Sequence, residues 1–318
     1  MSGMHGAQDR SAMLPEEIEE NMKDNQFLSG FAAIVGRPNV GKSTMMNAMV
    51  GEKVAIVSSR PQTTRNRIMG VATAPDHQIV FLDTPGLHKP RTKLGEYMVK
   101  SVEGAMDGID VLLVLVDVSD VGPQDRAIVE EMAARQVKKI LVLNKTDIVD
   151  EAKLMATIQS FSAEKYDAIV PISARTGKNM EELRRLIVSF LPQGPKYFPD
   201  DMMTDQPERV ICAEIIREKA LLHLRDEVPH GVGVEMMRIQ KLSENMTEIH
   251  ATIYCERASH KGIIIGKQGA MLRTIGAEAR RDIENLLGTR VNLQLWVKVR
   301  EDWRNRMDDL RTLGYEDM

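Results

Sequence analysis

The sequence predicts two domains, an α/β domain with a mostly parallel sheet and helices on both faces, followed by a smaller α+β domain. Three observations support this prediction. The chain has 318 residues, which is long for one compact domain. From residue 31 onward, short apolar runs alternate with helical stretches, as in sheets with crossover helices. A proline-rich segment then ends this alternation, and a different order of elements follows.

The limits of the elements follow from the periodicity of apolar residues. The apolar runs expected as buried strands are 31–35, 79–82, 111–116, 140–143 and 169–172. Helices are expected at 42–50, 125–135 and 180–191. The second domain should then begin with a helix at 208–226 and two strands at 232–239 and 247–255. A short helix around Arg257, a long helix at 270–287 and a last strand at 291–299 should follow. We expect a mobile N-terminal extension at 1–27, the first domain at 28–191, a proline-rich linker at 192–207, and the second domain with its tail at 208–318.

Composition and charge exclude several classes of protein. The net charge of -4 argues against coating of nucleic acid by bulk charge, so RNA binding would need a local basic patch. Cys212 and Cys255 are too few for a disulfide framework or a zinc site, and we expect them to be buried thiols. The sequence shows no apolar run of membrane-spanning length and no secretory signal pattern, so we expect a cytoplasmic protein.

A phosphate-binding loop is predicted directly after the first strand. Residues 36–43, Gly-Arg-Pro-Asn-Val-Gly-Lys-Ser, match GxxxxGK[ST] between a strand and a helix, the context that this motif requires. Backbone N–H groups and the helix N-terminus would face the phosphates, Lys42 would neutralise the β- and γ-phosphates, and Ser43 would ligate magnesium. The residues expected around the phosphates are Gly36, Asn39, Val40, Gly41, Lys42, Ser43 and Thr44. The alternative is a glycine-rich turn without a ligand.

Three further motifs follow the ends of later strands. Asp83 begins Asp-Thr-Pro-Gly and can reach magnesium through water, while the N–H of Gly86 can approach the γ-phosphate. Asn144-Lys145-Thr146-Asp147 indicates guanine, because the Asp147 carboxylate can accept two hydrogen bonds from the base and adenine offers no such donor pair. Lys145 would cover the base with its methylene stem. Ser173-Ala174 would offer a backbone N–H to the guanine oxygen. Together the motifs predict a GTP-binding and GTP-hydrolysing protein with GTP or GDP and Mg²⁺ as its ligands.

These motifs resemble the translation-factor-like branch of GTPases. Residues 61–65, Pro-Gln-Thr-Thr-Arg, are similar to the first switch of that branch, in which a threonine completes the magnesium shell when GTP is bound. We assign this role, and a part in catalysis with Lys42 and Gly86, to Thr64; Thr63 is the alternative ligand, and an ordinary polar loop is the alternative interpretation.

Hydrolysis is expected to be slow. Leu87 occupies the place of the water-orienting glutamine that Ras-like GTPases carry after DxxG. A related group with the same hydrophobic substitution has an asparagine in the phosphate loop that helps to hold potassium, and Asn39 matches it. We therefore hypothesise that K⁺ near Asn39 assists catalysis. Stabilisation of the turn by Asn39 is an equally good interpretation.

The second domain contains a GxxG loop. Ile265-Gly266-Lys267-Gln268-Gly269 fits the loop of a KH module, in which Lys267 meets phosphate and flanking apolar residues form the base groove. We add Arg273 to the expected RNA contacts. Between residues 257 and 281 there are six Lys and Arg residues against the single acid Glu278. A structural turn between helices, in a domain that binds proteins, is the alternative.

The combination resembles the Era family of bacterial GTPases over residues 28–315, with a P-loop GTPase domain and a type II KH domain. This resemblance implies binding of the 3′ end of 16S rRNA, a role in assembly of the small (30S) ribosomal subunit, and a peripheral association with the inner face of the cell membrane. We also expect a monomer. The alternatives are a GTPase-regulated RNA-modification enzyme, for which no second catalytic constellation is visible after Pro207, and a membrane-tethered signalling GTPase. The basic tail from Trp296 to Tyr315 is interpreted either as an RNA contact or as a solvated helix.

Overall fold

The computed structural model describes residues 27–58, 60, 63–87, 90, 92–226 and 228–315. The expected N-terminal extension therefore lies outside the described residues, except for Phe27, which is buried beside the first strand. Pro61 and Gln62 of the first switch also lie outside them.

The first domain is built on a six-stranded sheet with the order β2-β3-β1-β4-β5-β6. Its strands are β1 (Leu28–Gly36), β2 (Ile68–Thr73), β3 (His77–Asp83), β4 (Val111–Asp117), β5 (Lys138–Asn144) and β6 (Ala168–Pro171). All neighbours are parallel except β2, which pairs antiparallel with β3 at the edge. The five expected parallel strands are confirmed, and β2 is an addition that the sequence did not single out. The carboxyl ends of β1, β3, β4 and β5 therefore meet at one edge of the sheet, where ligands bind in such folds.

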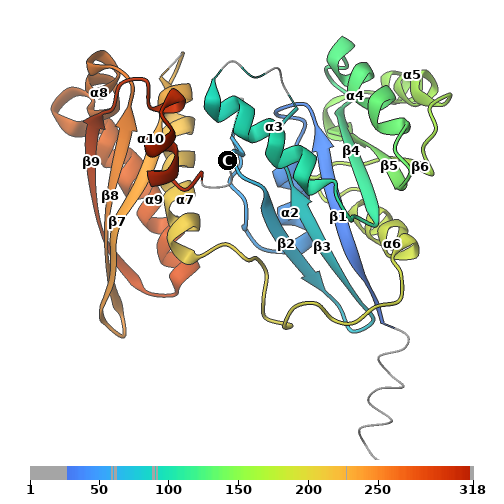
Figure 1. The fold of residues 1–318 in the computed structure, drawn as a ribbon, viewed down its shortest axis with the longest axis horizontal. Helices are drawn as coiled ribbons and strands as arrows, with labels where there is room; N and C mark the ends of the chain where they lie inside the picture. Colours follow the sequence, from blue (N-terminus) through green and yellow to red (C-terminus); the bar gives the residue numbers. More distant parts are fainter. Residues whose placement is uncertain are drawn as a thin grey trace, which may run out of the picture.

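Helices cover both faces of this sheet (Figure 1). They are α2 (Lys42–Val50), α3 (Lys93–Ala105), α4 (Pro123–Ala133), α5 (Glu151–Phe161) and α6 (Met180–Phe190). One apolar core joins α2 and α6 to one face of the sheet, and another joins α3, α4 and α5 to the opposite face. This arrangement confirms the predicted α/β fold class and explains why the central strands are apolar on both sides.

The second domain has the element order that the sequence predicts. Its elements are α7 (Glu208–His223), β7 (Gly233–Ser243), β8 (Met246–Cys255), α8 (Ala258–Ile265), α9 (Ala270–Leu287), β9 (Arg290–Val299) and α10 (Met307–Thr312). The three strands form one sheet in the order β7-β8-β9, with β8 and β9 parallel. Helices α7, α8 and α9 share one apolar core with this sheet. Cys212 and Cys255 lie in that core as free thiols, as expected.

The proline-rich linker contains no helix or strand, and it is fastened to the edge of the first sheet. Figure 1 shows it passing beneath β2 and β3 before it enters α7. The backbone N–H of Val71 in β2 donates to the carbonyl of Met203 at 2.8 Å, and the Thr204 hydroxyl donates to the carbonyl of Met69 at 2.6 Å. The linker thus covers hydrogen-bonding groups that an edge strand would otherwise expose.

The C-terminal tail packs between the two domains, which differs from the interpretation as a solvated helix; an RNA contact by its basic residues stays a prediction. Trp303 is fully buried, and its indole N–H donates to the carbonyl of Gly231 at 2.9 Å. Trp303, Leu310 and Tyr315 form one apolar cluster with residues of α3 in the first domain. The apolar residues of the tail therefore help to fix where it lies, together with basic ones such as Arg304, which pairs with Glu256 at 2.6 Å.

Candidate functional site

The phosphate loop joins β1 to α2 and lines a cavity of about 370 Å³. Gly41 adopts a left-handed φ of 100° immediately before the first residue of α2. A Cβ atom at Gly41 would lie 2.3 Å from Nδ2 of Asn144, so a side chain would be both strained and obstructed. The loop places the N-terminus of α2 on the cavity, which is the arrangement that binds phosphate groups.

Lys42 is held within the loop itself. Its Nζ donates to the carbonyls of Gly36 at 3.2 Å and Arg37 at 3.1 Å. Burial lowers the pKa of Lys42 to about 8, although the nearby Asp83 carboxylate favours the charged form. An anion in the cavity would give this buried cation a counter-charge.

The three expected magnesium ligands come together from three different segments. The Ser43 hydroxyl donates to Oδ2 of Asp83 at 2.5 Å, and its Oγ lies 2.9 Å from Oγ1 of Thr64. Ser43 is the second residue of α2, Asp83 ends β3, and Thr64 lies in the segment between α2 and β2. The geometry therefore favours Thr64 over Thr63, whose hydroxyl donates instead to the carbonyl of Arg60 at 2.6 Å.

These residues fit a hard divalent cation. Asp83 is fully buried, and its Oδ1 has no hydrogen-bond partner among the described residues. Burial also raises the pKa of Asp83 to about 6, while Lys42 and the Ser43 hydroxyl oppose that rise. A cation bound by hydroxyl and carboxylate oxygens would satisfy the orphaned atom and favour the ionised carboxylate. No cluster of His, Cys, Asp and Glu suited to a metal occurs in the described part of the chain, so this mixed oxygen set is the candidate site.

Gly86 contacts the phosphate loop closely. A Cβ atom at Gly86 would lie 2.6 Å from the backbone nitrogen of Pro38. The backbone N–H of Leu87 donates to the carbonyl of Gly36 at 3.1 Å, which fastens the end of Asp-Thr-Pro-Gly to the start of the loop. The absence of a side chain at Gly86 is therefore required by the loop itself, in addition to any approach to the γ-phosphate that the sequence suggests.

Asn144 links two parts of the site. Its Nδ2 donates to the carbonyl of Val40 at 2.8 Å, and its Oδ1 accepts from the backbone N–H of Ala174 at 3.0 Å. This finding modifies the expectation for Ala174, because its N–H already has an acceptor. The same N–H would have to be shared with Asn144 or released from it to bind the guanine oxygen.

The Asp147 carboxylate also has partners before any base binds. Oδ1 accepts from the Ser173 hydroxyl at 2.7 Å, and Oδ2 accepts from Arg175 at 2.5 Å. The Ser173 hydrogen bond, together with Arg175, lowers the pKa of Asp147. An adenine base would therefore not leave the carboxylate unpaired, which changes the argument made from sequence. Discrimination between guanine and adenine at Asp147 would then depend on the donors that the base adds to a carboxylate that is already ionised and oriented.

Lys145 is positioned by a residue that the sequence did not single out. Its Nζ donates to Oδ2 of Asp117 at 2.6 Å. Asp117 ends β4, and its Oδ1 accepts from the backbone N–H and the hydroxyl of Ser119 at 2.9 and 2.6 Å. Lys145 itself has a left-handed φ of 68° and lines the nucleotide cavity. Asp117 thus fixes the side chain that is expected to cover the guanine base.

Asn39 lies on the exposed part of the phosphate loop with a φ of 66°, and it lines the cavity. Asparagine tolerates this left-handed conformation better than most residues do, so the turn-stabilising interpretation is compatible with the structure. Its place on the cavity is equally compatible with a contact to a cation beside the phosphates.

In the second domain, the GxxG loop lies between α8 and α9. Gly266, Gln268 and Gly269 all have positive φ, and Arg273 donates to the carbonyl of Gln268 at 2.7 Å. Lys267 and Arg273 are exposed, while Ile265 is packed against the core. A groove of about 560 Å³ runs beside the loop between α9 and β9, and its lining includes Gly269, Leu272, Arg273, Gly276, Ala277, Arg280, Val291, Asn292, Leu293 and Leu295. An apolar groove with basic residues at its margin suits single-stranded nucleic acid.

Comparison with known proteins identifies both domains. The family model described as a 50S ribosome-binding GTPase matches residues 31–145, and the KH domain model matches residues 227–304. The GTPase Era of Clostridioides difficile (strain 630) is 54% identical over 295 residues, covering 92% of this chain and 99% of that protein. The chain belongs to the GTPase Era family. The GTPase Era of Alkaliphilus metalliredigens (strain QYMF) is 53% identical over 91% of this chain and 99% of its own length.

Solved structures of Era share the whole described fold. Era in complex with MgGDPNP and nucleotides 1506–1542 of 16S ribosomal RNA aligns with a TM-score of 0.85 and 40% identity, over 91% of this chain and 99% of that one. A variant of Aquifex aeolicus Era bound to GDP·AlF₄⁻ aligns with a TM-score of 0.87 at the same identity and coverage. As a member of the Era family, the protein is a GTPase with a KH domain.

Proposed function

We propose that this Era-family GTPase binds the 3′ end of 16S rRNA through its KH domain and acts as a GTP-controlled switch in assembly of the small ribosomal subunit. The observation that carries the proposal is the likeness, over 91% of the chain, to an Era that holds MgGDPNP and a 16S rRNA segment together. The chain offers a place for each ligand, namely the cavity at the phosphate loop and the groove between α9 and β9.

The residues of the nucleotide cavity have the following proposed roles. Lys42 and the N-terminus of α2 bind the phosphates, and Asn144, Lys145 and Asp147 bind the guanine base. The oxygens of Ser43, Thr64 and Asp83 converge in the structure and would hold Mg²⁺, which would supply charge stabilisation to the transferring phosphoryl group. Gly36, Val40, Gly41, Thr44 and Gly86 contribute backbone contacts, and Ser173 and Ala174 border the base.

Slow hydrolysis assisted by K⁺ is part of this proposal. Leu87 offers no side-chain hydrogen bond to a water molecule, and its carbonyl accepts from Gln124 at 2.8 Å. A potassium ion held by Asn39 beside the phosphates would supply positive charge where negative charge develops during hydrolysis. The exposed position of Asn39 on the cavity supports this role.

The RNA contacts are proposed at the GxxG loop and the groove beside it. The glycines let the backbone approach the RNA, Lys267 and Arg273 meet phosphates, and the apolar floor of the groove receives bases. Ile265 and Gln268 complete the contact surface. The domain limits 28–191 and 208–318, with the linker at 192–207, also remain proposals.

An RNA-binding experiment tests this function. A single-stranded oligonucleotide with the sequence of the 16S rRNA 3′ end should bind the wild type, and Lys267→Ala should weaken binding by about tenfold through loss of a charged phosphate contact. Lys241→Ala, in the β7–β8 hairpin away from the groove, is the matched control. Equal binding by wild type and Lys267→Ala would contradict the proposed surface, and absence of binding by the wild type would contradict the proposed function.

We propose that the protein is a cytoplasmic monomer, and that it makes the peripheral contact with the inner face of the membrane that its family resemblance implies. Among the described residues, no helix is long and apolar enough to cross a membrane. Sedimentation of the purified protein with and without anionic lipid vesicles measures its oligomeric state and its binding to the membrane surface. A dimer, or the absence of vesicle binding at low salt, would contradict the corresponding part.

A further inference from the structure

The proposed metal ligand Thr64 lies between two residues that the KH domain holds. On one side, the backbone carbonyl of Thr63 accepts a hydrogen bond from Arg217 of α7. On the other side, the guanidinium of Arg65 donates to the carbonyls of Val232 at 2.8 Å and His230 at 3.2 Å. Of these three consecutive residues, Thr64 therefore directs its hydroxyl to the proposed metal site. Thr63 and Arg65, on either side of it, contact the KH domain.

Arg217 makes a buried and well-supported contact, unlike an ion pair at the protein surface. Its side chain is 1% exposed, and Glu214, one turn earlier in α7, accepts two hydrogen bonds from it, including one from Nε at 2.7 Å. Burial opposes the charged form, yet the Glu214 carboxylate holds the pKa of Arg217 above its ordinary value. A bidentate pair of this kind fixes the direction of the remaining N–H groups, and one of them meets Thr63.

A contact to the Thr63 carbonyl acts directly on Thr64. The peptide unit between them is planar, so fixing the Thr63 carbonyl also fixes the N–H and the Cα position of Thr64. The Thr64 side chain is 7% exposed, and its Oγ1 lies 2.9 Å from Oγ of Ser43. Rotation of the Thr64 side chain is then the main freedom that remains for bringing Oγ1 to a metal ion.

The next residue of α7 holds the beginning of the same segment. Glu218 is 3% exposed, and it accepts from the backbone N–H of Val57 at 2.8 Å and from Lys53 at 2.6 Å. Val57 and Thr64 both line the nucleotide cavity. Glu218 and Arg217, which both belong to the KH domain, therefore hold the segment that borders the nucleotide cavity at Val57 and at Thr63.

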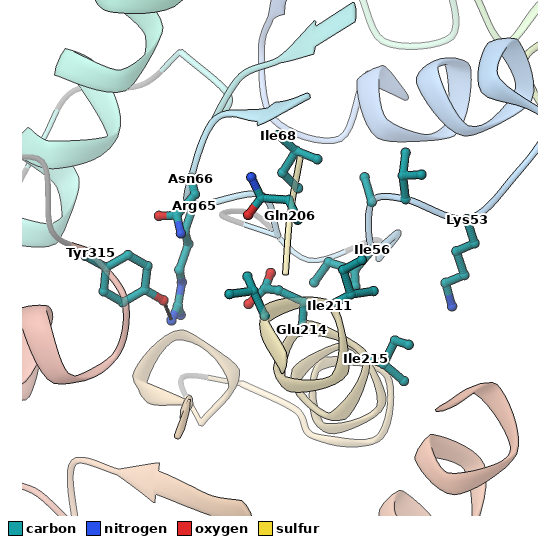
Figure 2. Close-up of a pocket in the computed structure, with 13 residues that line it drawn as sticks. Lys53, Ile56, Arg65, Asn66, Ile68, Gln206, Ile211, Glu214, Ile215 and Tyr315 are labelled. Atoms are coloured by element: carbon teal, nitrogen blue, oxygen red, sulfur yellow. Dashed lines mark hydrogen bonds between the residues drawn. The ribbon is translucent and has the colours of Figure 1, made fainter. Parts of the chain in front are cut away.

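Apolar side chains of both domains pack near this contact. Ile211, Glu214 and Ile215 of α7 line the pocket drawn in Figure 2, together with Ile56 and Ile68 of the GTPase domain. The cavity left between the domains has a volume of about 20 Å³, which is room for about one water molecule. Because the Arg217 side chain is 1% exposed, its charged hydrogen bond to the Thr63 carbonyl is stronger than one at an exposed surface.

We infer that Arg217 is a positioning residue for GTP hydrolysis, which holds the Thr63 carbonyl and thereby keeps Thr64 in place to complete the magnesium shell. The KH domain thus supplies part of the support for the GTPase site. This inference rests on the proposed role of Thr64 as a magnesium ligand in the GTP state.

The test compares Arg217→Gln with Arg209→Gln in the full-length protein. Arg209 is an arginine of the same helix that donates to the carbonyl of Met236 inside the KH domain, so its variant controls for loss of a charge from α7. Arg217→Gln should lower kcat for GTP by about tenfold or more and raise the Mg²⁺ concentration for half-maximal turnover several-fold. Mg·GDP affinity should remain within about twofold of wild type, because Thr64 is a ligand only with GTP. Arg217→Lys should recover part of the lost kcat, since it can still donate to the carbonyl.

Three outcomes would overturn the inference. They are wild-type kcat and Mg²⁺ dependence in Arg217→Gln, the same losses in Arg209→Gln, and an equal fall in GDP and GTP affinity, which would indicate a general structural role. Thr64→Ala separates this inference from the proposed function. If Thr64→Ala hydrolyses GTP at the wild-type rate, the proposed role of Thr64 is wrong; if it is slow while Arg217→Gln is not, the inference alone is wrong.

Discussion

The contact between Asp117 and Lys145 gives a sharp prediction for guanine binding. Asp117→Asn preserves the shape of the side chain and an acceptor for Ser119, but it removes the charge that holds Lys145. Asp117 is 7% exposed, and the Lys145 side chain is 33% exposed, so the pair is covered on one side and wet on the other.

The magnitude follows from this partial burial. A hydrogen bond between charged groups contributes about 1.5–3 kcal/mol, and the exposure of Lys145 places this pair at the lower end of that range. A loss of about 1.4 kcal/mol corresponds to a tenfold change in affinity. We therefore expect Asp117→Asn to weaken GDP and GTP binding equally, by about tenfold, because both nucleotides share the base. Turnover at saturating GTP should not change, because Lys145 does not touch the phosphates in this assignment.

Stopped-flow dissociation of a fluorescent GDP measures the effect. Asp167→Asn is a matched control, because Asp167 also pairs with lysine and accepts from a backbone N–H, but it lies at the start of β6. Equal dissociation rates for wild type and Asp117→Asn would refute the positioning argument. A fall in kcat with unchanged GDP affinity would refute the assignment of Lys145 to the base.

Three further predictions concern the thiols, the metal and the monovalent cation. Burial raises the pKa of Cys212 to about 12, so iodoacetamide at pH 8 should leave both buried thiols unmodified in the native protein and label them only as the KH domain unfolds; rapid native labelling would contradict this. Burial raises the pKa of Asp83 to about 6, so below that pH Mg²⁺ must displace a proton from the carboxyl group. The apparent Mg²⁺ affinity should therefore fall by up to about tenfold per pH unit below 6 and stay level above it. An apparent Mg²⁺ affinity that does not change from pH 5 to 7 would contradict the metal assignment. Turnover should be faster in K⁺ than in Na⁺, and Asn39→Ala should remove the difference; equal rates in the two salts for the wild type would exclude the potassium hypothesis.

Much of the fold could be predicted because its evidence is local in the sequence. The strands β1, β3, β5 and β6 are short apolar runs, and each of the four nucleotide motifs begins at or just after the end of one of them. The order of elements in the second domain follows from the same periodicities, and the KH match at residues 227–304 supports it. The edge strand β2 was harder to recognise, because its six residues follow the polar switch segment.

The contacts that position the site could not be predicted, because their partners are far apart in the chain. Asp117 meets Lys145 only because β4 and β5 are parallel neighbours with Asp117 opposite Asn144. Arg217 reaches Thr63 only through the docking of two domains. The basic residues of the tail suggested an RNA contact or a solvated helix. In the structure, the burial of Trp303 helps to fix the tail between the domains. Such pairs depend on the register of neighbouring strands and on how the two domains dock, and a local sequence pattern does not predict either of these.

The affinity for RNA in the two nucleotide states tests the central claim most directly. The full-length protein with Mg²⁺ is titrated with an oligonucleotide of the 16S rRNA 3′ end, once with GDP and once with a non-hydrolysable GTP analogue. Because Thr64, at the proposed magnesium site, is flanked by residues that the KH domain holds, we expect RNA to bind about tenfold more tightly with the analogue, which is within the range of typical coupling energies. Equal RNA affinity with the two nucleotides would contradict the claim that this GTPase is a switch for its KH domain.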